Sequence, residues 1–186
     1  MFETLNNWMD RGLDWFDRVV GEKVRPRPTI ITPEIRERLK SMRVLLVGGH
    51  PEAPLEQINK VLTDAGMQVC WERHDMHLIP KNFDLPPLRL RPDELLVNNT
   101  NLFNVVIVDW RKTPTYEWGW SPCSIFMKFG KGTLRIGIGP EDKREQQLGE
   151  GAKTFLSYDQ FLVEDVEPLL VALATASIAE EEFATR

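Results

Sequence analysis

Short runs of apolar residues recur along the chain after residue 42, and longer polar or mixed stretches separate them. Within each run the apolar residues are mostly consecutive, which is typical of strands that are covered on both faces of a parallel sheet. The sequence therefore predicts a doubly wound, flavodoxin-like α/β fold with a five-stranded parallel sheet and right-handed crossovers. The five runs are R-V-L-L-V from Arg43, M-Q-V-C-W-E-R from Met67, V-V-I-V from Val105, T-L-R-I-G-I from Thr133 and K-T-F-L-S-Y from Lys153.

Three stretches with helical periodicity lie around these runs. A short helix should begin after Thr32, because a hydroxyl can cap a helix whose first residue is Pro33. A second helix, from Glu52 to Ala65, should end at Gly66. A third should close the chain. Its predicted inward-facing residues are Val163, Val166, Leu169, Leu170 and Leu173.

The first twenty residues form a separate pattern, in which large apolar side chains recur every three or four positions. This spacing places them on one helical face, which either packs on the protein's own domain, docks to another chain or lies on a membrane surface. A proline-containing segment follows and favours extended chain. We expect residues 1–40 to be an amphipathic helix with a linker and residues 41–186 to be a single domain. The apolar face comprises Phe2, Leu5, Trp8, Met9, Leu13, Phe16 and Val20.

Composition narrows the possible partners. A chain of 186 residues with a net charge of -5 is poorly suited to a nucleic-acid backbone. No apolar run reaches the roughly 20 residues of a membrane-spanning helix. Two cysteines without a secretory signal indicate free thiols and a cytoplasmic protein. We expect a homo-oligomer or a protein partner bound through the first helix.

Ligands of doubly wound sheets bind outside the carboxyl ends of the strands, so residues that follow the predicted strands are the candidates for a functional site. Asp109 ends the third run, and Glu117 lies in the loop beyond it. The turn Gly48-Gly49-His50 follows the first run and lacks the third glycine of the dinucleotide fingerprint. His74, Asp75 and His77 are close in sequence without a fourth ligand. We expect no metal and no cofactor.

Several of these segments resemble the nucleoside 2-deoxyribosyltransferase family and the related deoxynucleotide N-glycosidases and TIR-type NAD hydrolases. They are R-V-L-L-V-G-G-H, N-V-V-I-V-D, T-Y-E-W-G-W-S and F-G-K-G-T-L-R-I-G-I. The resemblance implies cleavage or transfer of an N-glycosidic bond on a nucleoside, nucleotide or NAD-like substrate. It makes Glu117 the nucleophile, with Gly119 and Ser121 packed behind it and with Gly48, Gly49 and His50 in the substrate wall. Such chemistry often needs a second acid, so Asp109 is expected to bind a sugar hydroxyl, and Trp110 and Tyr116 are expected to stack on a base.

Two alternatives remain open. V-V-I-V-D-W-R-K-T-P and the segment after Lys153 also resemble a response-regulator receiver domain, with Asp109 in the phosphoacceptor place. Glycines stand where the acidic pair for magnesium is expected, and Ser157 or Tyr158 replaces the expected lysine, so the receiver would be a degenerate one that signals by binding. The other alternative is an assembly protein that docks through the tryptophan-bearing first helix and needs no site.

Overall fold

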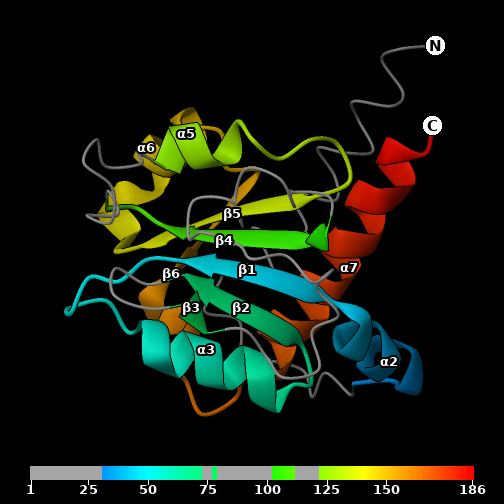
Figure 1. Cartoon of the computed structure of the whole chain (residues 1–186). Coiled ribbons are helices and arrows are strands. Elements are labelled where there is room, and N and C mark those ends of the chain that lie inside the picture. Colours follow the sequence, from blue (N-terminus) through cyan, green and yellow to red (C-terminus); the bar gives the residue numbers. More distant parts are fainter. Residues whose placement is uncertain (1–30, 73–76, 79–101, 112–121) are drawn as a thin grey trace.

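A six-stranded sheet with helices on both faces forms the body of the protein in a computed structural model, which describes residues 31–72, 77–78, 102–111 and 122–186 (Figure 1). The strand order is β3-β2-β1-β4-β5-β6. Five strands are parallel, and β3 alone pairs antiparallel, at the edge beside β2. Without β3, this is the flavodoxin-like order, so the predicted five-stranded parallel sheet is confirmed. The strands are β1 (Arg43–Val47), β2 (Gln68–Glu72), β3 (His77–Leu78), β4 (Val105–Asp109), β5 (Leu134–Gly139) and β6 (Thr154–Ser157).

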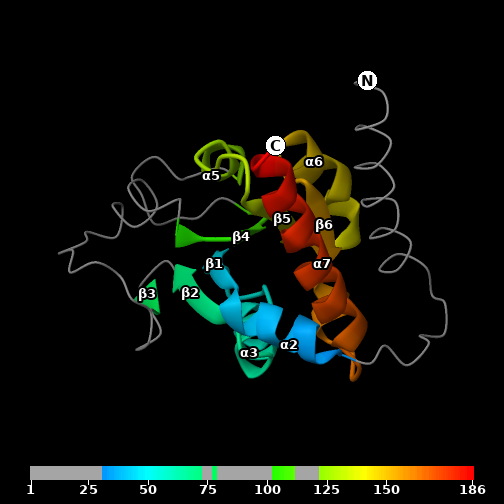
Figure 2. The same cartoon turned by 90° about the vertical axis from the view of Figure 1, so that its right-hand side faces the viewer.

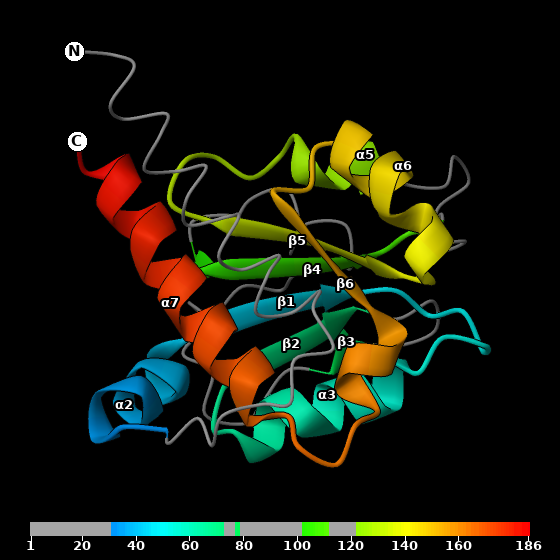
Figure 3. The same cartoon turned by 180° about the vertical axis from the view of Figure 1, so that it is seen from behind.

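The helices form two layers, one on each face of the sheet (Figures 1 and 3). On one face lie α2 (Pro33–Ser41), α3 (Leu55–Asp64) and α7 (Glu167–Ala184), whose apolar residues join one core cluster. On the other face lie α5 (Pro122–Phe126) and α6 (Arg144–Gly149), beside a second cluster. The short 3-10 helix η2 (Glu141–Lys143) precedes α6, and the short 3-10 helix η3 (Tyr158–Phe161) follows β6.

Consecutive apolar residues in the strands supply both clusters at once. Val44 and Leu46 of β1 belong to the first cluster, and Leu45 and Val47 belong to the second. Successive side chains of a strand point to opposite faces, so a strand between two helical layers must be apolar at nearly every position. This requirement explains the unbroken runs in the sequence.

The helix α2 begins as predicted and then packs against the last helix of the chain. Thr32 Oγ1 accepts a hydrogen bond from the Ile35 N–H at 3.3 Å, and Leu39 is buried. The Arg38 guanidinium donates to Ser177 Oγ at 2.6 Å and lies 2.7 Å from Glu181 Oε1. These bonds hold α2 in contact with α7. The predicted boundary near residue 40, between a first segment and the main domain, stays a prediction.

The last helix begins later than the sequence suggested. Residues Leu169, Leu170 and Leu173 are buried as predicted, whereas Val163 is 51% exposed and lies before the helix begins. The expectation for Val163 was wrong because α7 starts at Glu167, whose N–H donates to Asp165 Oδ1 at 3.1 Å. Within the described part of the chain, none of the helices has the length and apolar character that crossing a bilayer demands.

Replacing Val106 with Asp tests the assignment of β4. Val106 is completely buried in the second core cluster, so an unpaired carboxylate there should destabilise the fold by several kcal/mol. We expect the variant to be insoluble or to show no cooperative thermal transition. The control is Met127→Asp at an 80% exposed side chain, which should melt like the wild type. A cooperative, wild-type-like transition for Val106→Asp would contradict the strand assignment.

Candidate functional site

Asp109 occupies the carboxyl end of β4 and is only 1% exposed. Its Oδ1 accepts a hydrogen bond from the Tyr158 hydroxyl at 2.8 Å and one from the Arg111 N–H at 3.3 Å. Its Oδ2 is also buried and receives no hydrogen bond from the described residues. Burial raises the pKa of the Asp109 carboxyl above its ordinary value, and the hydrogen bonds from Tyr158 and Arg111 oppose that rise. The burial therefore favours the neutral acid.

Tyr158 is the first residue of η3, the short helix that follows β6, and its hydroxyl points toward Asp109. Ser157 and Gln160 form a capping box, in which the Ser157 N–H donates to Gln160 Oε1 at 2.9 Å. Burial and the neighbouring Asp109 raise the pKa of the Tyr158 hydroxyl well above its ordinary range, so this hydroxyl remains a donor. In the sequence, the only signal for this residue was its place near the end of the last run, where a receiver domain is expected to have lysine.

Gly48 closes the other side of the Asp109 carboxyl. Its φ is +152°, and a Cβ at this position would lie 2.8 Å from Asp109 Cβ and 2.9 Å from Leu55 Cδ1. The Gly48 carbonyl accepts from the Trp71 indole N–H at 3.0 Å. Any side chain at position 48 would therefore collide with Asp109 or displace it.

Arg111 joins the two loops that follow β1 and β4. Its guanidinium contacts His50 Nδ1 and lies 3.2 Å from Glu52 Oε2, so it spans the point at which the strand order reverses. The same guanidinium lies 5.1 Å from the centre of the Trp110 ring, and Lys143 Nζ lies 4.9 Å from that ring centre. Each such cation–π contact is worth about 0.5–1 kcal/mol at an exposed site. The Trp110 ring is thus already in contact with two cations.

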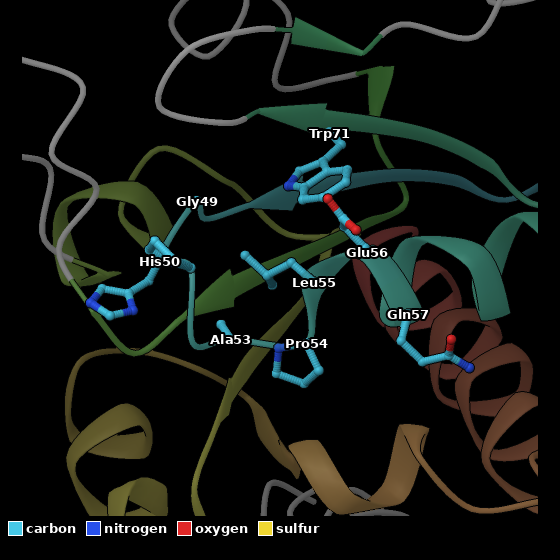
Figure 4. A pocket seen from close by; sticks show the side chains of 9 residues that line it. Gly49, His50, Ala53, Pro54, Leu55, Glu56, Gln57 and Trp71 are labelled. Carbon is cyan, nitrogen blue, oxygen red and sulfur yellow. The ribbon is translucent and has the colours of Figure 1, made fainter.

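A hollow of about 560 Å³ lies beside this cluster, between the loop after β1 and the start of α3 (Figure 4). In this view the His50 ring lies well apart from the Trp71 ring, and the Gln57 side chain lies farthest from His50. Gly49 and His50 line the hollow, whereas Gly48, Asp109 and Trp110 do not. The predicted site residues are therefore divided between an open hollow and a buried polar pair. The lining comprises Gly49, His50, Pro51, Ala53, Pro54, Leu55, Glu56, Gln57 and Trp71.

The remaining predicted site residues, Tyr116, Glu117, Gly119 and Ser121, lie outside the described residues. Their assigned roles, like those of the residues that the structure describes, stay predictions. His74 and Asp75 also lie outside. Within the described ranges, no three His, Cys, Asp or Glu side chains come together as metal ligands would.

The described residues around Asp109 do not fit the magnesium ion that phosphorylation of a receiver aspartate requires. Magnesium is bound through carboxylates, and the two positions after β1 are Gly48 and Gly49. The close approach of Gly48 to Asp109 leaves no room for a carboxylate at position 48. The nearest acid in that loop, Glu52, is paired with Arg111.

Comparison with known proteins gives a distant likeness of fold. No protein-family model matches the chain, and no curated protein matches it. A solved structure described as a response regulator receiver domain protein from Clostridium thermocellum is 17% identical, with a TM-score of 0.47, and the match covers 77% of this chain and 98% of that one. The TT0316 protein from Thermus thermophilus is 18% identical, with a TM-score of 0.34, over 95% of this chain and 60% of that one. Neither is described as a deoxyribosyltransferase or an N-glycosidase.

Gly48→Ala tests the contact between Gly48 and Asp109. The added methyl group would require both a displaced Asp109 and a strained backbone, which should cost about 1–3 kcal/mol of unfolding free energy. The measurement is urea unfolding followed by circular dichroism. Gly130→Ala is the matched control, because a Cβ there would meet nothing within 4 Å. Equal midpoints for the two variants would contradict the contact.

The burial of Asp109 also predicts how stability depends on pH. Because the folded pKa lies above the ordinary 3.8, the folded protein holds this proton more tightly than the unfolded chain does. The contribution of this proton to the free energy of unfolding is complete below pH 3.8 and is lost as the pH rises through the folded pKa of Asp109. We expect urea unfolding at a series of pH values to show wild type losing stability relative to Asp109→Asn across this window. Tyr158→Phe removes a donor that favours the charged form and should extend the loss to higher pH.

Proposed function

We propose that this chain is a receiver-like interaction module whose central aspartate is enclosed by the fold and accepts no phosphoryl group. The observation that carries the proposal is the buried Asp109 carboxyl, which already accepts hydrogen bonds from Tyr158 and Arg111. In-line attack on a phosphodonor needs an exposed carboxylate oxygen with a metal ion beside it. Asp109 is 1% exposed, and the positions that would supply more carboxylates are glycines.

The same burial bears on the N-glycosidase alternative. A carboxyl group that holds a sugar hydroxyl must reach the ligand, and no atom of Asp109 lines the hollow beside His50. Cleavage of an N-glycosidic bond would therefore depend on Glu117 and not on Asp109, the other predicted acid. Binding a protein partner requires neither acid to be accessible, and it agrees with the exposed apolar residues of the described surface.

Three measurements on the full chain test this function. Incubation with acetyl phosphate and magnesium should leave the intact mass unchanged, and a panel of nucleosides, nucleotides and NAD should show no base release by chromatography. Proteins that co-purify with the wild-type chain from the cells that produce it should also co-purify with Asp109→Asn.

Two results would overturn the proposal. One is a phosphoryl adduct that disappears in Asp109→Asn, which would make Asp109 a phosphoacceptor. The other is base release that disappears in Glu117→Ala, which would support the N-glycosidase alternative.

A further inference from the structure

Two consecutive apolar side chains are exposed between η3 and α7. Leu162 is 53% exposed and Val163 is 51% exposed. The other large apolar side chains that the structure shows as exposed, Met127 and Ile178, are single residues after α5 and in α7. An apolar side chain of another segment could cover this exposed pair, and burying the apolar surface would stabilise the contact.

Acidic residues lie on both sides of this pair in the sequence. Asp159, Glu164, Asp165 and Glu167 are all exposed, and none of them is ion-paired with another described residue. From residue 154 to residue 185 the chain has seven acidic residues and no Lys or Arg. The surface over 159–167, which we call the acidic patch, therefore favours a basic segment that also carries an apolar side chain.

The chain itself contains such a segment, directly before the described residues begin. The sequence E-K-V-R-P-R-P at 22–28 places Lys23, Arg25 and Arg27 around Val24. The segment leads to Ile31, which packs against the same core cluster as Val166 at the start of α7.

The starts of α2 and α7 lie at the same end of the molecule in two perpendicular views (Figures 2 and 3). An extended chain covers roughly 3.5 Å per residue, so Arg27 can reach about 14 Å from Ile31 and Lys23 about 28 Å. Arg38 of α2 contacts Ser177, and about 15 Å of helix separates Ser177 from the start of α7 at Glu167, which is less than the reach of Lys23.

The neighbouring helices already show the same pairing of charge. Arg38 of α2 contacts Glu181 of α7 at 2.7 Å and Ser177 at 2.6 Å. The stretch from residue 23 to residue 43 has seven basic and two acidic residues, so its net charge is opposite to that of the last helix and the loop before it. A second contact between residues 22–28 and the acidic patch would continue an interface that α2 and α7 have begun.

We propose that residues 22–28 dock on the acidic patch, with Val24 against Leu162 and Val163 and with the basic side chains beside the surrounding acids. Exposed ion pairs are individually weak, at about 0.2–1 kcal/mol, but a tethered segment has an effective concentration in the millimolar range. Pro26 and Pro28 also limit the freedom that docking removes. The contact is independent of the function proposed above.

Cross-linking of the full chain tests the position of the segment. With Cys123 changed to Ser, the pair Val24→Cys and Val163→Cys should form an intramolecular disulfide under mild oxidation. The pair Val24→Cys and Met127→Cys is the control, because α5, which ends before Met127, lies on the other face of the sheet. An equal yield from both pairs would overturn the proposal. A Val24–Val163 cross-link found only between molecules would overturn it too, in favour of a second copy.

Hydrogen exchange tests the contribution of charge. In the full chain carrying Lys23→Glu, Arg25→Glu and Arg27→Glu, the amides of residues 160–167 should exchange about five- to tenfold faster than in the wild type. Adding Asp159→Lys and Glu164→Lys, which leave the hydrogen bond from the Glu167 N–H to Asp165 intact, should restore slow exchange, because the two segments are again of opposite charge. Raising the salt concentration should weaken protection in the wild type. Unchanged exchange in the first variant would overturn the proposal.

Discussion

Burial of one carboxyl group at the end of β4 constrains the residues around it. Asp109 lies where the central strand meets the loops, and its Oδ1 requires a donor because a buried acceptor without one is costly. Tyr158 supplies that donor from the end of β6, and Gly48 leaves the space on the other side. Residues at or just after the ends of three strands thus meet at one buried polar contact, at the edge of the sheet where the ligands of doubly wound folds usually bind.

Arg111 and Trp110 continue the same arrangement toward the surface. The guanidinium joins the loop after β1 to the loop after β4, and the indole ring lies near both Arg111 and Lys143. The ring fits there because Gly139 has no side chain, and a Cβ at that position would lie 2.7 Å from Trp110 Cδ1. Trp110, which the sequence analysis expects to stack on a base, therefore contacts side chains of the protein itself.

The sequence predicts the sheet well because each central strand must be apolar on both faces, and Val105–Asp109 shows this requirement without interruption. It does not predict β3, since two residues at an edge have no periodicity to detect. The chemistry at Asp109 is harder to predict. An acid at a strand end suggests catalysis, but its burial depends on Tyr158, which is 49 residues away, and on a glycine in another loop. Val163 was misplaced for a similar reason, because α7 begins only at Glu167, whose N–H bonds to Asp165 Oδ1, and apolar spacing does not predict this local contact.

The packing of α2 on α7 has a consequence for how the protein is made. Arg38 and its partner Ser177 are 139 positions apart, so α2 leaves the ribosome long before the helix that covers it has been synthesised. Until then Leu39 and Met42, which are fully buried in the finished protein, have no complete apolar surroundings. Contacts of such wide separation slow folding, and the exposed intermediate is prone to aggregate. A nascent chain halted before α7 is therefore expected to remain unfolded or to require a chaperone, although most of its sheet has already been translated.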